Sequence, residues 1–166
     1  MQRGLPPILN SRARVLILGS FPSVKSLAAL EYYAHPQNQF WKILLTIAGK
    51  TGVNASHTYA ARKQIALGMG VGIWDVVDAC EREGSGDERI ENALLNDFSV
   101  LSKRAPGLSR VCFNGQAAAK LGHAAFAGLH YETVVLPSTS PRNARMPLLE
   151  KTRIWKEAVL PGGSTA

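Results

Sequence analysis

Four short apolar segments, separated by segments of helical character, constrain the fold of this chain more than any other feature. They are Arg14–Leu18, Val71–Val77, Arg110–Asn114 and Thr133–Leu136. Short runs without regular polar alternation are typical of strands that are buried on both faces. Because helical segments connect them, we expect an α/β fold in three layers, with a central four-stranded parallel sheet between helices.

Five segments between and after these strands have the spacing or composition of helices. The expected helices are Gln39–Ala48, Ser56–Leu67, Glu88–Lys103, Gly115–Gly122 and Pro147–Leu160. Ser56 has the side chain of a helix N-cap, and Gly49 is a suitable stop for the first helix.

The composition predicts one folded domain over residues 1–166, with a core of about 12–160 and a frayed tail at 161–166. Cys80 and Cys112 are the only cysteines, which excludes a disulfide framework. No apolar run approaches the roughly 18 residues of a membrane span. Met1–Leu9 lacks the apolar core of a signal peptide. We therefore expect a cytoplasmic protein without a membrane partner.

The charge balance allows two interpretations. Nineteen Lys and Arg against 12 Asp and Glu give a formal net charge of +7. Small basic domains often bind polyanions, since each neutralised phosphate releases counterions. A basic protein without a nucleic-acid partner is equally compatible with this charge.

Several common functional motifs are absent from the sequence. It contains neither a Walker A loop nor GxGxxG, and its four histidines lack the spacing of metal ligands, so we expect no metal and no cofactor. Ser20 follows a predicted strand and could belong to a small esterase. The GxSxG nucleophile elbow is missing, however, which counts against that alternative.

Polar residues follow the predicted strands at the positions where parallel α/β sheets bind ligands. These segments are Gly19–Ser23, Asp75–Asp78, Asn114–Gly115 and Pro137–Asn143. Ligands of such sheets bind outside the carboxyl ends of the strands. The last segment combines hydroxyls with Arg142 and suits a phosphate, although an ordinary strand-to-helix loop has a similar composition.

Three segments, taken in order, resemble the motifs of one enzyme superfamily. Gly19–Ser23 reads GSFPS, Tyr33–Trp41 reads YAHPQNQFW, and Leu136–Arg142 reads LPSTSPR. Together they are similar to motifs of the uracil-DNA glycosylase superfamily, most of all to its hypoxanthine-DNA (deoxyinosine) glycosylases. Mismatch-specific uracil/thymine glycosylases are the next closest branch. The resemblance runs from about Val15 to Trp155.

The resemblance implies a DNA repair enzyme that hydrolyses the N-glycosidic bond of a deaminated base in double-stranded DNA. It assigns catalysis to Asn38 and stacking on the extruded base to Phe40. From the residues alone, a helix cap is the favoured interpretation of Asn38 and a core position that of Phe40. Phe21 departs from the uracil-specific pattern, because it stands where relatives have an Asp or Asn that positions water. This departure counts against ordinary uracil chemistry.

Two further catalytic candidates are Asn114 and Asp75. The Asn114 amide can read a base edge, although an Asn-Gly turn explains it equally well. Asp75 can accept a hydrogen bond from a purine N–H or stabilise a cationic sugar, unless it caps the next turn.

The resemblance also implies which residues surround the base and hold the DNA. Ser138 and Ser140 are expected to bind phosphate, with Pro141 and Arg142 filling the space that the extruded nucleotide leaves. The DNA-binding candidates are Ser138, Thr139, Ser140, Pro141, Arg142 and Asn143, and the pocket candidates beside Phe40 are Ser20, Phe21, Tyr33 and His35.

No lysine stands out as a Schiff-base nucleophile, so the expected enzyme is monofunctional and does not cleave the strand. We expect it to act as a monomer at the nucleoid. Two alternatives share the same fold: a mismatch-specific uracil/thymine glycosylase and a DNA-binding module without catalysis.

Overall fold

The computed structural model describes residues 1–51 and 57–160, and its centre is a parallel four-stranded sheet. The strands are β2 (Val15–Gly19), β3 (Val71–Asp75), β6 (Arg110–Asn114) and β7 (Glu132–Leu136). Their order is β3-β2-β6-β7. Every residue of β2 and β3 is buried, as their uninterrupted apolar sequences predict. The predicted α/β fold with four parallel strands is confirmed.

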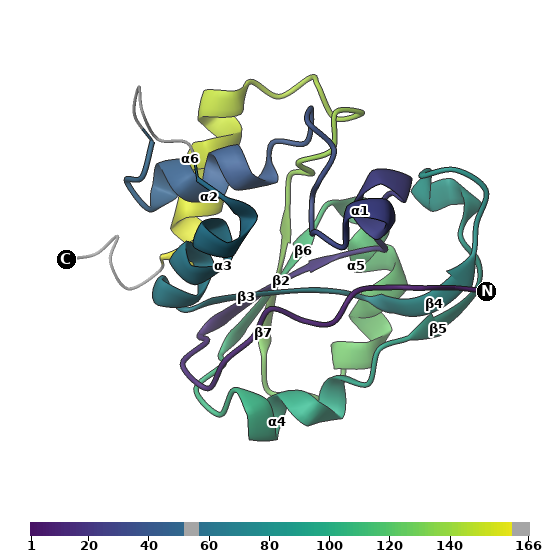
Figure 1. Cartoon of the computed structure of the whole chain (residues 1–166). Coiled ribbons are helices and arrows are strands. Elements are labelled where there is room, and N and C mark those ends of the chain that lie inside the picture. Colours follow the sequence, from purple (N-terminus) through teal and green to yellow (C-terminus); the bar gives the residue numbers. More distant parts are fainter. Residues whose placement is uncertain (52–56, 161–166) are drawn as a thin grey trace.

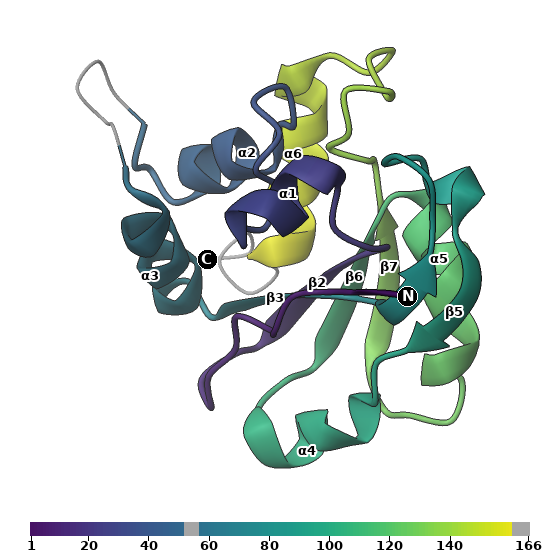
Figure 2. The same cartoon turned by 45° about the vertical axis from the view of Figure 1, so that its right-hand side comes forward.

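Helices cover both faces of this sheet. Figures 1 and 2 show α2, α3 and α6 together on one face and α5 on the other. The helices are α1 (Val24–Ala29), α2 (Phe40–Ile47), α3 (Tyr59–Gly68), α4 (Leu101–Arg104), α5 (Gln116–Gly122) and α6 (Leu148–Val159). The predicted cap Ser56 and the predicted tail 161–166 lie outside the described residues. The N-cap of α3 is Thr58, whose hydroxyl accepts a hydrogen bond from the Ala61 N–H at 3.1 Å.

The predicted helix Glu88–Lys103 is wrong. The segment begins with a 3₁₀ turn, continues as strand β5 (Glu91–Leu95), and ends with a second 3₁₀ turn and the short α4. Strand β5 pairs antiparallel with β4 (Val77–Glu81), which also pairs with β1 (Gln2–Arg3). Glu, Ala and Leu are good helix formers, but helix propensity is a small term per residue, and pairing along β4 outweighs it.

The predicted strand Val71–Val77 is divided between the two sheets. Strand β3 ends at Asp75 and β4 begins at Val77, so the chain leaves the parallel sheet at Val76. This change of sheet places Asp75 at the carboxyl end of a parallel strand, beside Gly19 of β2, with which it pairs in register.

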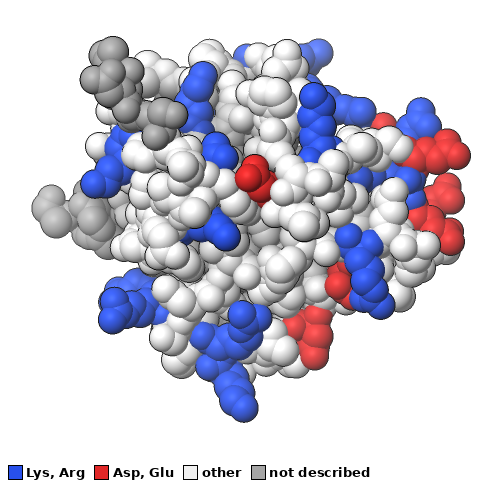
Figure 3. Space-filling view, viewed as in Figure 1, with Lys and Arg blue, Asp and Glu red and all other residues white. Residues whose placement is uncertain are grey.

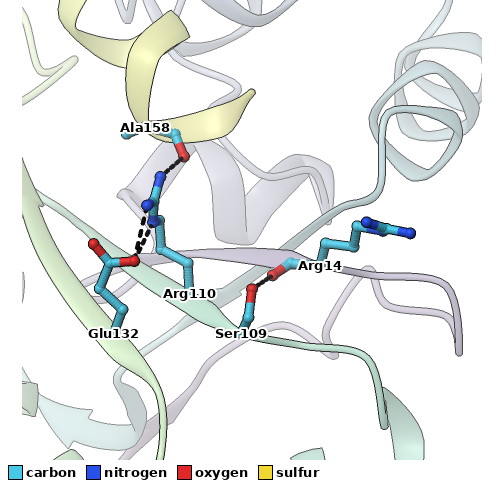
Figure 4. A network of polar contacts seen from close by, with 5 residues as sticks. All are labelled: Arg14, Ser109, Arg110, Glu132 and Ala158. Atoms are coloured by element: carbon cyan, nitrogen blue, oxygen red, sulfur yellow. Dashed lines mark hydrogen bonds and ion pairs between the residues drawn. The ribbon is translucent and has the colours of Figure 1, made fainter. Parts of the chain in front are cut away.

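A polar network fixes the opposite edge of the parallel sheet, where the strands begin (Figure 4). The Arg110 guanidinium donates to Glu132 at 2.8 Å and to the Ala158 carbonyl at 2.7 Å. Ser109 Oγ donates to the Arg14 carbonyl at 3.4 Å. The network therefore joins β6 and β7 to the end of α6.

None of the helices in residues 1–51 and 57–160 has the length and apolar character needed to cross a bilayer.

Candidate active site

A cavity of about 480 Å³ opens at the carboxyl ends of the parallel strands. Its walls come from β2, β3 and β6, from the start of α1, and from the loops before α2 and after β7. Among the predicted site residues, Phe40 and Asn143 do not line it. Those that do are Ser20, Phe21, Tyr33, His35, Asn38, Asp75, Asn114, Ser138, Thr139, Ser140, Pro141 and Arg142.

Asp75 lies at the base of this cavity against Gly19. A Cβ on Gly19 would lie 2.6 Å from Asp75 Oδ1, so the close approach of the two strand ends requires glycine. Burial, together with the charge of Asp87, raises the pKa of Asp75 to about 7, while Arg82 acts in the opposite direction. Asp75 Oδ2 is buried and has no hydrogen-bond partner in the described part of the chain. The wall of the cavity therefore contains a carboxyl group whose pKa is raised to about 7, and its buried Oδ2 has no partner among the described residues.

A second carboxyl group, that of Asp87, lines the same cavity. Ser20 Oγ donates to Asp87 Oδ2 at 3.1 Å, and burial raises the pKa of Asp87. This Ser–Asp contact is not the Ser–His pairing of an esterase. The ring of Phe21 also lines the cavity, and the Arg82 guanidinium lies 5.0 Å from its centre.

Asn114, at the end of β6, joins two loops of the site. Its Oδ1 accepts from the Thr139 N–H at 3.0 Å, and its Nδ2 donates to Thr139 Oγ1 at 2.9 Å and to Tyr33 Oη at 3.2 Å. The next residue, Gly115, has φ of +95° and approaches the Ser138 side chain closely. In this state the Asn114 amide holds Thr139 and Tyr33 in place.

Asn38 lies in the turn that precedes α2. Its Oδ1 accepts from the Phe40 N–H at 3.0 Å, while Gln39 occupies the N-cap position itself. This contact fixes the carboxamide and leaves Nδ2 as the group that can donate to a ligand. Capping of the helix start and ligand binding are therefore compatible at this residue.

Lys151, a buried lysine of α6, joins the Asn38 turn to the loop after β7. The side chain is fully buried, and Nζ donates to Gln39 Oε1 at 2.9 Å, to the Ser138 carbonyl at 2.9 Å and to the Asn143 carbonyl at 3.0 Å. The Gln39 N–H also donates to the Thr139 carbonyl at 3.0 Å. Two segments that are far apart in sequence are thus held in one arrangement.

The rim of the cavity carries exposed charges of both signs. Arg142 Nη1 contacts both carboxylate oxygens of Glu88 at 3.1 Å, and both side chains are mostly exposed. The hydrogen bond from Arg142 contributes to lowering the pKa of Glu88, after a larger backbone contribution. Figure 3 draws the face of the molecule seen in Figure 1. Lys and Arg are spread over this face, whereas Asp and Glu lie mainly on the side of β4 and β5.

The family model of the uracil DNA glycosylase superfamily matches residues 6–159. The chain belongs to this superfamily.

Two curated relatives within the superfamily cover most of the chain. A hypoxanthine DNA glycosylase from Methanosarcina acetivorans is 37% identical over 145 residues, covering 87% of this chain and 90% of the relative. A hypoxanthine DNA glycosylase from Methanosarcina barkeri is 36% identical over 157 residues, covering 95% and 97%. The solution NMR structure of a proposed uracil DNA glycosylase from Methanosarcina acetivorans superposes with a TM-score of 0.82 at 35% identity, covering 95% of both chains.

Phe40 is the residue at which the superfamily expectation and this structure differ. It is fully buried and does not line the cavity, so it presents no free face to a base here. The Tyr33 ring covers it instead, with ring centres 4.0 Å apart and planes 19° from parallel. Phe40 therefore lies in the segment where the stacking ring was expected, but the Tyr33 ring covers the face that a base would contact.

Sequence reasoning missed three charged residues of the site. Asp87 lies immediately before the wrongly predicted helix, and the exposed Lys25 lies on the short α1, which was not predicted. For Lys151, the sequence contained a pattern that predicts burial. The residue lies one turn before the buried Trp155 and three residues after Leu148, which places it on the inward face of α6.

Proposed function

We propose that this protein is a monofunctional DNA glycosylase that removes hypoxanthine from deoxyinosine in double-stranded DNA. The names of two relatives at 37% and 36% identity support this substrate. The observation that carries the proposal is the cavity itself, in which Asn38, Asp75 and the Ser138–Arg142 loop meet. Its volume of about 480 Å³ suits a single extruded nucleotide.

The loop Ser138–Arg142 would hold the DNA backbone while the nucleotide is extruded. Ser138 and Ser140 offer hydroxyls to phosphate, and Arg142 exchanges Glu88 for phosphate oxygens. Extrusion costs a few kcal/mol and least at a mismatched pair, which favours a deaminated base over a normal one.

Cleavage then breaks the bond between C1′ and N9 of the nucleotide. The bonding electrons leave with hypoxanthine, C1′ becomes cationic, and water adds to C1′ and gives a proton to the departing base. Phe21 cannot activate water, so we infer that the site acts mainly by stabilising the separated charges.

Asn38 and Asp75 are the residues to which we assign this stabilisation. Asn38 Nδ2 donates to the departing base, whose charge is negative in the transition state. Asp75, when ionised, would either accept a hydrogen bond from a purine N–H or stabilise the positive charge on the sugar. Adenine has an acceptor in place of the N1–H of hypoxanthine, so an ionised Asp75 disfavours it.

The proposal is tested with labelled duplexes that contain inosine, uracil, xanthine or a thymine mismatch, each treated with alkali after incubation. We expect alkali-labile product from inosine, no trapped adduct with borohydride, and undiminished activity in EDTA. An inosine duplex that stays intact would refute the proposal. Strong release of uracil with none of hypoxanthine would assign the mismatch-specific branch instead.

Asn38→Ala separates an enzyme from a DNA-binding module of the same fold. Loss of one preorganised contact typically lowers the rate by about 10²–10³, and we expect this loss with little change in duplex affinity. Gln37→Ala is the matched control, because it truncates an exposed carboxamide in the same turn. Equal activity of both variants would remove Asn38 from the catalytic site.

We further propose that the enzyme acts as a monomer on nucleoid DNA. Sedimentation of the protein with and without an inosine duplex tests this stoichiometry.

A further inference from the structure

Hydrolysis in this cavity needs a group that accepts the proton of the attacking water, and few side chains of the site can do so. Asp75, Asp87 and His35 are the lining residues that can accept a proton near neutral pH. His35 Nδ1 already accepts a hydrogen bond from the Gln37 N–H at 3.1 Å, so the neutral ring carries its own proton on Nε2. Asp75 is buried, and its Oδ2 is closed to solvent. Asp87 is the acceptor that remains.

The carboxyl group of Asp87 lies where water can reach it. Asp87 lines the cavity and is also exposed to solvent, which places it at the opening. Ser20, directly after β2, is 7% exposed, and its Oγ donates to Asp87 Oδ2 at 3.1 Å. Among residues 1–51 and 57–160, no other group donates a hydrogen bond to this carboxyl. Ser20 therefore orients one oxygen of Asp87, and the other oxygen, Oδ1, can accept from water.

Neither phosphate binding nor a salt bridge explains a carboxyl group at this opening. A negative charge beside bound DNA repels the backbone and lowers the affinity for the duplex. The two nearby arginines have other partners within the described part of the chain. Arg142 pairs with Glu88, and Arg82 donates to the Pro22 carbonyl at 2.6 Å. The position of Asp87 thus costs DNA affinity, and a role in the reaction would account for that cost.

We propose that Asp87, oriented by Ser20, is a further catalytic residue that binds the attacking water and takes its proton. The inference rests on the proposed function. As the water oxygen bonds to C1′, its proton moves to Asp87 Oδ1, and the electrons of the C1′–N9 bond leave with hypoxanthine. Asp87 then gives the proton to the hypoxanthine anion, so the carboxylate is restored and the net reaction is hydrolysis.

The surroundings of Asp87 suit a base of this kind. Partial burial raises the pKa of Asp87, while the hydrogen bond from Ser20 acts in the opposite direction. Arg82 and Arg142 also favour the ionised form, and Glu88 opposes it. A general base is most effective when its pKa approaches the working pH, so an upward shift favours proton transfer from water.

The test combines single-turnover cleavage of the inosine duplex with the affinity for an undamaged duplex of the same sequence, measured by fluorescence anisotropy. Asp87→Asn keeps the shape of the side chain and an acceptor for Ser20, but its carboxamide cannot take a proton. We expect its cleavage rate to fall about a hundredfold. Loss of a negative charge should at the same time raise duplex affinity severalfold at low salt.

Two further variants complete this comparison. Ser20→Ala removes the hydrogen bond that orients the carboxylate, so we expect a rate about five- to tenfold lower. Glu83→Gln is the control, because it neutralises an exposed carboxylate of the same segment that does not line the cavity. Its cleavage rate should equal that of the wild type.

Chemical rescue separates a proton acceptor from a structural residue. Asp87→Ala leaves space for a small carboxylate, so we expect added formate to restore part of the lost rate at constant ionic strength. Formate should not accelerate the wild type or Ser20→Ala, because both retain the carboxyl group of Asp87. A folded Asp87→Ala protein whose rate does not respond to formate would contradict the inference.

The inference is also overturned if Asp87→Asn cleaves within about threefold of the wild-type rate, or if it loses duplex affinity together with rate. If Ser20→Ala does not fold, as judged by circular dichroism, the exposed Asp87→Asn decides alone. The proposed function fails in a different way, when the wild type leaves the inosine duplex intact. A wild type that cleaves, beside an Asp87→Asn variant that cleaves equally well, refutes only the role of Asp87.

Discussion

Replacing Asp75 by asparagine tests whether the carboxyl group of Asp75 stays protonated up to near neutral pH in the folded protein. In the unfolded chain this carboxyl has a pKa near its ordinary value of 3.8, and in the folded protein burial raises it to about 7. Between these values the folded state binds a proton that the unfolded state does not. Asp75 therefore stabilises the fold at low pH, and this stability is lost as the pH rises through 7.

The size of the effect follows from the shift in pKa. Each pH unit between about 4 and 7 changes the free energy of unfolding by about 1.4 kcal/mol. Because the slope falls as the pH approaches 7, the interval from pH 5 to pH 7 corresponds to about 2.3 kcal/mol, with only about 0.3 kcal/mol more to pH 8. The carboxamide that replaces the carboxyl group carries no charge at any of these values, so the variant lacks this dependence and is relatively more stable at pH 8.

The assay is urea denaturation of wild type and Asp75→Asn at pH 5, 6, 7 and 8 at constant ionic strength. The effects of other titrating groups cancel when the free energies of unfolding of the two proteins are subtracted. We expect this difference to change by about 2–3 kcal/mol between pH 8 and pH 5, in favour of the wild type at pH 5. Asp78→Asn is the control, because it neutralises a half-exposed carboxylate three residues away. A difference that is constant across this pH range would refute the buried proton.

The contacts between the two loops and the charges at the rim give two further predictions. Lys151→Met removes the donor of three hydrogen bonds, so we expect the two loops to separate and cleavage of the inosine duplex to fall about a hundredfold. Lys156→Met, on the exposed face of α6, is the control, and its activity in the same assay should stay near that of the wild type. Glu88→Gln frees Arg142 and removes a negative charge from the rim. Duplex affinity measured by fluorescence anisotropy should rise severalfold at low salt and less at high salt, and an unchanged affinity would place the duplex away from Arg142.

The parallel sheet could be predicted from the sequence because each of its strands is encoded locally. Apolar runs such as Val15–Gly19 have no polar residue that would need a solvent-exposed face, so their burial on both sides follows from composition. Strand β5 has no such local signal. Its sequence, ENALL, is mostly exposed and favours helix, and only pairing with β4 makes it a strand.

The site could be predicted as a set of residues but not as a set of contacts. The positions after the strands identified Asp75 and Asn114, since parallel strands end at one edge. The sequence could not show that Tyr33 lies across Phe40, because that depends on a left-handed residue and on a partner 81 residues away. The buried proton of Asp75 also depends on Asp87, which approaches from the segment between β4 and β5.

The distribution of charge determines which part of a nucleotide can enter this site. The chain as a whole is basic, with a net charge of +7, whereas its cavity contains the carboxyl groups of Asp75 and Asp87. In the proposed reaction, a phosphate is attracted to the basic surface but repelled by these carboxyl groups when they are ionised, so we expect the backbone to stay at the Ser138–Arg142 loop while the neutral base enters. We expect the sugar to become positive next to the same carboxyl groups when the glycosidic bond breaks. Their ionised forms, which would exclude phosphate in the ground state, would then stabilise the transition state, as catalysis by electrostatic preorganisation requires.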